Sequence, residues 1–173
     1  MAENEKQFES NIEAFLISPA GGYEKATDTG YISSAGMALD IQTLVEFVKA
    51  TQPVMWKRFE KRCNSDPYKK FYKCFEDAVQ MDGLIFVMRH GFKHRGLEFK
   101  VCYFKPESTL NDGAVKRYKQ NVCQCIRQWH YSEQNNNSVD MMLAINGIPV
   151  VAIELKNQLT GQTVDNAKLQ WQY

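Results

Sequence analysis

The sequence predicts an α/β protein in which a mixed β-sheet is flanked by helices, and three observations lead to this expectation. The first half carries apolar residues at helical spacing, with proline and glycine breaks between the segments. Near residues 81–83 the spacing changes to short β-rich runs. Residues 139–156 form two such runs on either side of an Asn-Gly pair, which is typical of a β-hairpin.

Length and composition limit the classes of protein that fit. The 173 residues are 44% hydrophobic and 24% charged, which suits one soluble globular domain with a sizeable core. No apolar run approaches the roughly 20 residues that cross a bilayer, and the polar, acidic start of the chain lacks a secretory signal. We therefore expect a cytoplasmic protein with no membrane partner.

Two further absences in the sequence narrow the chemistry. No Gly-rich phosphate loop occurs, so we expect no ATP to be bound by this part of the protein. The five cysteines are odd in number and lack paired spacing, which indicates reduced thiols and no zinc site: Cys63, Cys74, Cys102, Cys123 and Cys125.

Four helices are expected in the first half. On the first of them, Phe8, Ile12, Phe15 and Leu16 form the apolar face. An N-cap aspartate followed by proline starts the fourth. The first two helices are expected over Glu3 to Ile17 and Leu39 to Ala50. The third begins at Pro53 and the fourth at Asp66-Pro67.

Several strands are expected after residue 83. Leu84 to Met88 and Leu97 to Phe104 are β-rich, with the polar loop Arg89 to Gly96 between them. Val122 to Tyr131 is another strand, on which Gln128 and His130 share a face with Ile126, next to the predicted site. A helix over residues 162–173 follows the hairpin and has no stop signal, so we expect an N-terminal fragment of something longer.

The hairpin carries acids and a base at a spacing that suits metal-dependent hydrolysis. Asp140 lies on its first strand, and Glu154 and Lys156 share one face of the second, while Val151, Ile153 and Leu155 should face the core. Adjacent carboxylates repel unless a cation neutralises them, and Mg²⁺ prefers oxygen ligands. We therefore predict a Mg²⁺-dependent nuclease, with the backbone carbonyl of Leu155 as a further metal ligand.

The direction of Asp140 depends on the turn. A two-residue turn, Asn146-Gly147, would place Asp140 opposite Ile153 on the apolar face, whereas a three-residue loop that includes Ile148 would place it opposite Glu154. The cost of burying a lone carboxylate favours the three-residue loop, although a bulge would serve equally well.

This pattern of Asp140, Glu154 and Lys156 on a hairpin before a helix resembles the PD-(D/E)xK nuclease superfamily. More narrowly, the chain resembles the N-terminal nuclease region of the R (restriction) subunit of type I restriction enzymes. The similarity covers most of the chain and is strongest from Leu84 onward. The further stretches that match are Arg89-His90-Gly91, Tyr103-Phe104-Lys105-Pro106, Arg117-Tyr118, Asn121, Arg127-Gln128, His130-Tyr131, Asn146-Gly147-Ile148-Pro149, Asn157, Thr160-Gly161-Gln162 and Asn166-Ala167.

The resemblance implies a restriction-endonuclease-like α/β domain that hydrolyses phosphodiester bonds of double-stranded DNA with Mg²⁺. It implies a last core strand beyond the C-terminus. We take residues 1–173 as a single domain, with 122–173 as its catalytic core and with 36–80 as a helical elaboration, because those helices carry no catalytic constellation. The full-length subunit would couple cleavage to ATP-driven translocation and join methylation and specificity subunits.

The resemblance also assigns roles to residues. Asp140 and Glu154 carry over as metal ligands and Lys156 as the catalytic lysine. Glu9 is the best match for an acid on the N-terminal helix, with Glu13 as its rival. Gln172 and Tyr173 match a helix motif, with Gln170 as a rival for Gln172. Two other functions stay open: a non-catalytic module that docks within the same complex, and a nuclease of this fold with a repair role.

Overall fold

The computed structural model describes residues 5–28, 37–63, 66–130 and 137–155. Two compact units account for its contacts. Unit 1 comprises Met1–Thr29, Cys123–Ala144 and Pro149–Tyr173, and unit 2 comprises Gly30–Val122 and Ile145–Ile148. The expected single nuclease domain stays a prediction, and the expected helix over residues 162–173 lies outside the described residues.

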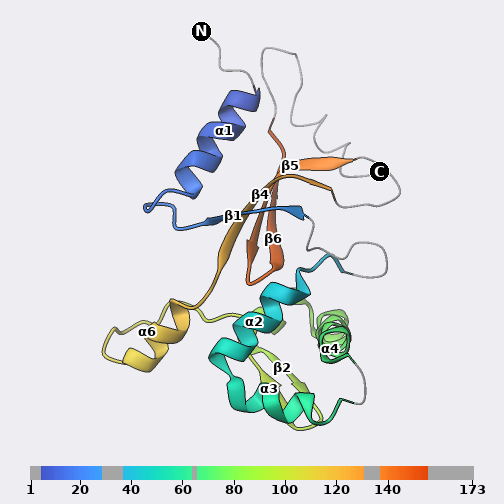
Figure 1. The fold of residues 1–173 in the computed structure, drawn as a ribbon. Coiled ribbons are helices and arrows are strands. Elements are labelled where there is room, and N and C mark those ends of the chain that lie inside the picture. Colours follow the sequence, from blue (N-terminus) through green and yellow to red (C-terminus); the bar gives the residue numbers. More distant parts are fainter. Residues whose placement is uncertain (1–4, 29–36, 64–65, 131–136, 156–173) are drawn as a thin grey trace. The chain divides into compact units, whose positions relative to one another are not determined.

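A four-stranded sheet carries Asp140 of the predicted site. Its strand order is β1 (Glu24–Ala26), β4 (Cys123–His130), β5 (Ser138–Ile145) and β6 (Ile148–Ile153) (Figure 1). β1 pairs with β4 in parallel, with Lys25 opposite Cys125, whereas β5 and β6 are neighbours joined by a two-residue turn and are therefore antiparallel. The predicted α/β class with a mixed sheet is confirmed.

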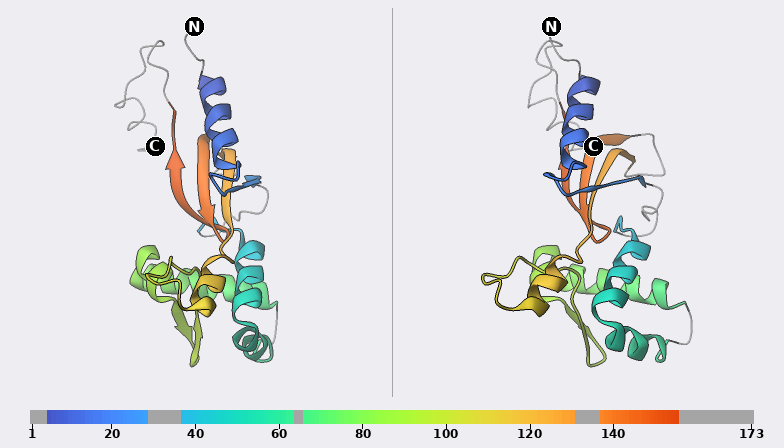
Figure 2. Two further views of the ribbon diagram at one scale, coloured as in Figure 1. Left: turned by 90° about the vertical axis from the view of Figure 1, so that its left-hand side faces the viewer. Right: turned by 60° about the vertical axis from the view of Figure 1, so that its left-hand side comes forward.

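Helix α1 (Glu5–Leu16) lies against β4 (Figure 2). Its buried residues are Glu9 and Glu13, whereas Phe8 is 48% exposed and Phe15 is 63% exposed. The apolar spacing of this helix therefore does not mark its buried face, because cationic side chains of the sheet pair with the two glutamates and make their burial tolerable.

The turn between β5 and β6 differs from the favoured prediction. It contains only Asn146 and Gly147, whose φ angles are 52° and 79°, so the three-residue loop was wrong. Two successive positive φ angles are typical of a type I′ turn, whose twist matches that of the flanking strands. On β6, an edge strand of the described sheet, Val151 is 46% exposed rather than in the core, while Leu155 beyond its end is 9% exposed.

In unit 2, three of the expected helices pack around an aromatic core. They are α2 (Ile41–Thr51), α3 (Pro53–Glu60) and α4 (Pro67–Asp82). Asp66 caps α4 as predicted, since its carboxylate accepts hydrogen bonds from the backbone N–H groups of Tyr68 and Lys69. Phe59, Phe71 and Phe99 contact one another edge to face and are each at most 2% exposed.

The segment after α4 was predicted incorrectly. Leu84 to Met88 belongs to helix α5 (Leu84–His90) rather than to a strand. It lies between Gly83 and Gly91, whose positive φ angles of 85° and 74° mark its two ends. The expected polar loop contains strand β2 (Phe92–His94), which pairs with the short β3 (Leu97–Phe99). A further short helix, α6 (Asp112–Tyr118), was not expected.

None of the described helices is long and apolar enough to cross a membrane.

Candidate functional site

Asp140 lies on β5, with its side chain partly buried beside the end of β6. The backbone N–H of Leu155 donates to Asp140 Oδ2 at 2.6 Å, and Gln128 Nε2 donates to Asp140 Oδ1 at 3.4 Å. Both donors that reach this carboxylate from the described residues are neutral. With a two-residue turn, the strand register places Asp140 on the face that was expected to be apolar. Its carboxylate is tolerated there because these hydrogen bonds replace part of its hydration.

The same Gln128 amide also reaches the N-terminal helix. Gln128 Nε2 lies 3.5 Å from Glu9 Oε1 and 3.4 Å from Glu9 Oε2, so one neutral N–H₂ group is shared by the carboxylates of Glu9 and Asp140. Glu9 is 4% exposed. Two carboxylates are thus brought to one nitrogen atom from α1 and β5, which lie at opposite ends of the sequence.

Arg127 holds the two glutamates of α1 in place. Its Nε donates to Glu9 Oε1 at 2.6 Å and its Nη1 donates to Glu13 Oε2 at 3.2 Å. The hydrogen bond to Glu9 is the largest cause that raises the pKa of Arg127 above its ordinary value. Lys25 Nζ, on β1, adds an ion pair with Glu13 Oε1 at 3.0 Å.

These contacts separate the roles of the two candidate helix acids. Glu13 is neutralised by two cations, Arg127 and Lys25. Glu9 also pairs with Arg127. In addition, it accepts from the Gln128 amide, which donates to Asp140 as well. The geometry therefore places Glu9, rather than Glu13, beside Asp140.

The remaining predicted residues are only partly described. Glu154 directly follows β6 and is joined through its peptide bond to the Leu155 nitrogen that donates to Asp140, so its backbone lies beside that carboxylate. Lys156, Gln170, Gln172 and Tyr173 lie outside the described residues, and their assignments stay predictions.

Oxygen donors of this kind fit a hard divalent cation. Mg²⁺ is usually held by one or two carboxylates and keeps several waters, so a small protein donor set is sufficient. Within the described ranges, no three acidic, histidine or cysteine side chains gather closely enough to hold a metal ion. Asp140, which lies near a second carboxylate and receives no cationic partner from the described residues, is where a cation would relieve repulsion.

Sequence reasoning missed the shape of β4 at this place. The alternation of side chains predicted Gln128 and His130 on the face of Ile126, yet Ile126 is fully buried and the other two are exposed. Gln128 has a φ of 48°, which interrupts the alternation. His130 then turns to Asp28: its Nδ1 lies 2.8 Å from Asp28 Oδ2, and this contact lowers the pKa of Asp28.

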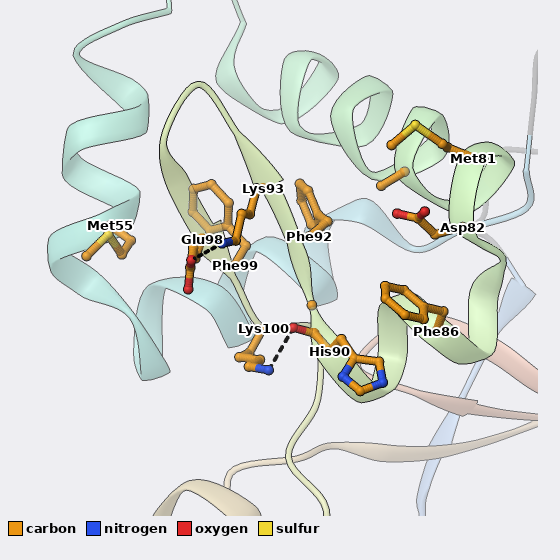
Figure 3. A pocket seen from close by; sticks show the side chains of 12 residues that line it. Met55, Met81, Asp82, Phe86, His90, Phe92, Lys93, Glu98, Phe99 and Lys100 are labelled. Carbon is orange, nitrogen blue, oxygen red and sulfur yellow. Dashed lines mark hydrogen bonds and ion pairs between the residues drawn. The ribbon is translucent and has the colours of Figure 1, made fainter.

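A separate cavity of about 550 Å³ lies within unit 2 (Figure 3). Apolar side chains including Phe86, Phe92 and Phe99 line it. Its cations are already engaged, because Lys93 Nζ pairs with Glu98 Oε1 at 2.6 Å and Lys100 Nζ donates to the His90 carbonyl oxygen at 2.7 Å. None of the predicted site residues lines this cavity.

Comparison with known proteins gives the family. The sequence model of one protein family, the type I restriction enzyme R protein N terminus, matches residues 43–172 of this chain. The chain belongs to this family. As an R protein N-terminal region it is part of a type I restriction system, which confirms the narrower of the two resemblances. The match includes β4, β5 and β6, whereas Glu9 precedes it.

No curated protein and no solved structure matches this chain.

Proposed function

We propose that this chain is a Mg²⁺-dependent endonuclease domain of the PD-(D/E)xK type, which hydrolyses phosphodiester bonds of double-stranded DNA in a type I restriction enzyme. The observation that carries the proposal is the sharing of the Gln128 amide by the carboxylates of Glu9 and Asp140, in a chain of the R protein N-terminal family. Carboxylates paired at one place, beside a strand end that leads to a lysine, suit metal-assisted hydrolysis.

Each residue has a distinct part in this proposal. Asp140 and Glu154, with the carbonyl of Leu155, would hold the cation. When bound, Mg²⁺ supplies positive charge that acidifies a water and offsets charge on the phosphate oxygens. The Leu155 N–H fixes the Asp140 carboxylate by its 2.6 Å hydrogen bond, and thereby ties the end of β6 to β5. Lys156 would donate to the phosphate or orient the attacking water.

The α1 side of the site contributes orientation and charge. Arg127 fixes the Glu9 carboxylate through a 2.6 Å ion pair, so that this carboxylate stays beside the Gln128 amide that it shares with Asp140. Gln172 and Tyr173 are proposed to complete the site from the following helix. In the full-length protein we propose ATP-driven DNA translocation by a further part of the chain, and assembly with methylation and specificity subunits.

The test is Mg²⁺- or Mn²⁺-dependent cleavage of supercoiled plasmid by the whole protein with its partner subunits and ATP. Asp140→Asn keeps an oxygen that accepts from the Leu155 N–H but removes the negative charge, and Lys156→Ala removes the catalytic amine. We expect each variant to lose cleavage by about 100-fold or more, since each removes a group that acts on the transition state.

Lys25→Met is the matched control, because it removes an exposed cation on β1 that contacts Glu13 and not Asp140. It should cleave like the unaltered protein. Cleavage by Lys156→Ala at the unaltered rate would overturn the proposal and leave the docking module as the better account.

A further inference from the structure

Gln128 has an unusual backbone for a residue inside a strand. Its φ of 48° lies in the left-handed region, which costs a non-glycine residue about 1 kcal/mol. Residues held in this way often serve a site, because neighbouring contacts must repay the strain. Here the distorted backbone presents the Gln128 carboxamide to Glu9 and Asp140.

The contacts of the carboxamide are suited to a cation-free site. Its N–H₂ group is the only part of the side chain that donates, and it is shared by both carboxylates at 3.4–3.5 Å. Arg127 already pairs with Glu9, whereas Asp140 receives only neutral donors, the amide and the Leu155 N–H, from the described residues, so the negative charge of Asp140 is offset only in part. A divalent cation would offset it fully, but it could not occupy the same place while the N–H₂ group points there.

We propose that the Gln128 carboxamide is a reversible ligand for a divalent cation. Without the cation, Nε2 bridges Glu9 and Asp140; when the cation binds, the amide rotates by half a turn and Oε1 faces it. This inference rests on the proposed function, since it takes Asp140 as a cation ligand. Amide nitrogen and oxygen are nearly equal in size, so the rotation needs no rearrangement of the strand.

Ser138 makes both orientations of the amide possible. Its hydroxyl donates to Gln128 Oε1 at 3.2 Å in the structure. A hydroxyl group both donates and accepts, so after the rotation Ser138 Oγ accepts from Nε2 instead. Ser138 and Asp140 share one face of β5, and both therefore flank the same carboxamide.

The experiment is a calorimetric titration of the whole protein with Mn²⁺. Gln128→Met keeps the length of the side chain and removes both amide atoms, and we expect it to weaken Mn²⁺ binding by roughly tenfold. Gln124→Met is the matched control on the same strand, since Gln124 Oε1 accepts no hydrogen bond from the described residues. It should bind Mn²⁺ like the unaltered protein.

A nuclear magnetic resonance readout separates a ligand from a merely structural residue. The side-chain amide signal of Gln128 is identified as the signal that is missing from the spectrum of the Gln128→Met variant. Addition of Mg²⁺ should shift this signal, because its protons leave two carboxylates and turn to a hydroxyl group. An unmoved signal under saturating Mg²⁺ would overturn the proposal.

Gln128→Glu provides a second variant if Gln128→Met does not fold. It places an oxygen where the rotated amide would, so it should bind Mn²⁺ at least as tightly as the unaltered protein. Weaker binding by Gln128→Glu, or unchanged binding by Gln128→Met, would overturn the role of Gln128.

Asp140→Asn distinguishes these failures from failure of the proposed function. If Asp140→Asn loses Mn²⁺ binding while Gln128→Met keeps it, the nuclease site stands without Gln128 as a ligand. If Asp140→Asn binds Mn²⁺ like the unaltered protein, both proposals are overturned.

Discussion

Arg127 is the residue on which the burial of the α1 carboxylates depends. Glu9 and Glu13 are at most 7% exposed, and its guanidinium contacts both of them. A buried carboxylate without a partner is strongly destabilising, whereas a paired and hydrogen-bonded one is tolerated. The stability of α1 on the sheet should therefore respond to Arg127 more than to the exposed aromatic residues of the same helix.

We expect Arg127→Met to lower the free energy of unfolding by about 3 kcal/mol, near the low end for a broken buried ion pair because the guanidinium is partly exposed. Urea denaturation at pH 7 measures this change. Lys25→Met is the control: it removes a cation that is 62% exposed from Glu13 and should cost less than about 1 kcal/mol. Equal losses in the two variants would contradict the role given to Arg127.

At the scale of single residues, the sequence predicted some of the site and missed the rest for a physical reason. Asp140 was named from its position on the predicted hairpin, whereas Glu9 was named through the resemblance, with Glu13 as its rival. The contacts of Gln128 with Glu9 and Asp140 could not be predicted, because alternation along a strand assumes an extended backbone and the left-handed φ of Gln128 breaks that assumption. The buried acidic face of α1 could not be predicted from its own sequence, because the cation that pairs with it lies more than 110 positions away.

Among the secondary-structure elements, the turn between β5 and β6 also fixes the start of α2. The Asp40 N–H donates to the Gly147 carbonyl oxygen at 3.0 Å, and the Asp40 side chain caps α2 by accepting from the Thr43 N–H at 3.1 Å. A Cβ atom added to Gly147 would clash with the Asp40 carbonyl oxygen. This turn therefore depends on glycine for space as well as for its φ of 79°.

Gly147→Ala and Gly96→Ala separate these two requirements. Gly96 has a φ of 76° and nothing within 4 Å of an added Cβ, so Gly96→Ala should cost only the backbone term of about 1 kcal/mol. Gly147→Ala should cost about 1–3 kcal/mol more, because it also displaces the cap of α2. Equal midpoints of urea denaturation for the two variants would contradict the proposed contact.

Elements with local signals were predicted well, and those that depend on distant partners were not. The start of α4 follows from Asp66 and Pro67 alone. Leu84 to Met88 was predicted as a strand because a short apolar run has no period that distinguishes strand from helix. β1 was not predicted because it has three residues and pairs with β4 about 100 positions later.

For the whole molecule, a buried carboxylate with a lowered pKa makes stability depend on pH. Glu76, 6% exposed, accepts from Lys73 Nζ at 2.8 Å, and this hydrogen bond is the largest cause that lowers its pKa. A group whose pKa is lower in the folded state binds more protons when unfolded. Its contribution is therefore complete above about pH 5 and is lost as the pH falls through the folded pKa.

We expect Glu76→Gln to lower the free energy of unfolding by about 1 kcal/mol at pH 7, with a difference from the unaltered protein that shrinks toward pH 3. Urea denaturation between pH 7 and pH 3 measures it. Asp77→Asn is the control, because Asp77 also pairs with Lys73 but is 61% exposed. Its effect should be small at every pH, and a difference for Glu76→Gln that does not vary with pH would contradict the assignment.

The distance along the chain between Glu9 and Gln128 has a consequence for synthesis. The two residues are separated by 119 positions, so a ribosome adding 5–20 residues per second needs about 6–24 s to make the second after the first. During that interval α1 carries two acidic side chains whose partner Arg127 has not yet been made. An unfinished chain therefore lacks the amide that Glu9 and Asp140 share. Under the proposed nuclease function, a nascent subunit would not cleave DNA until its sheet has been translated.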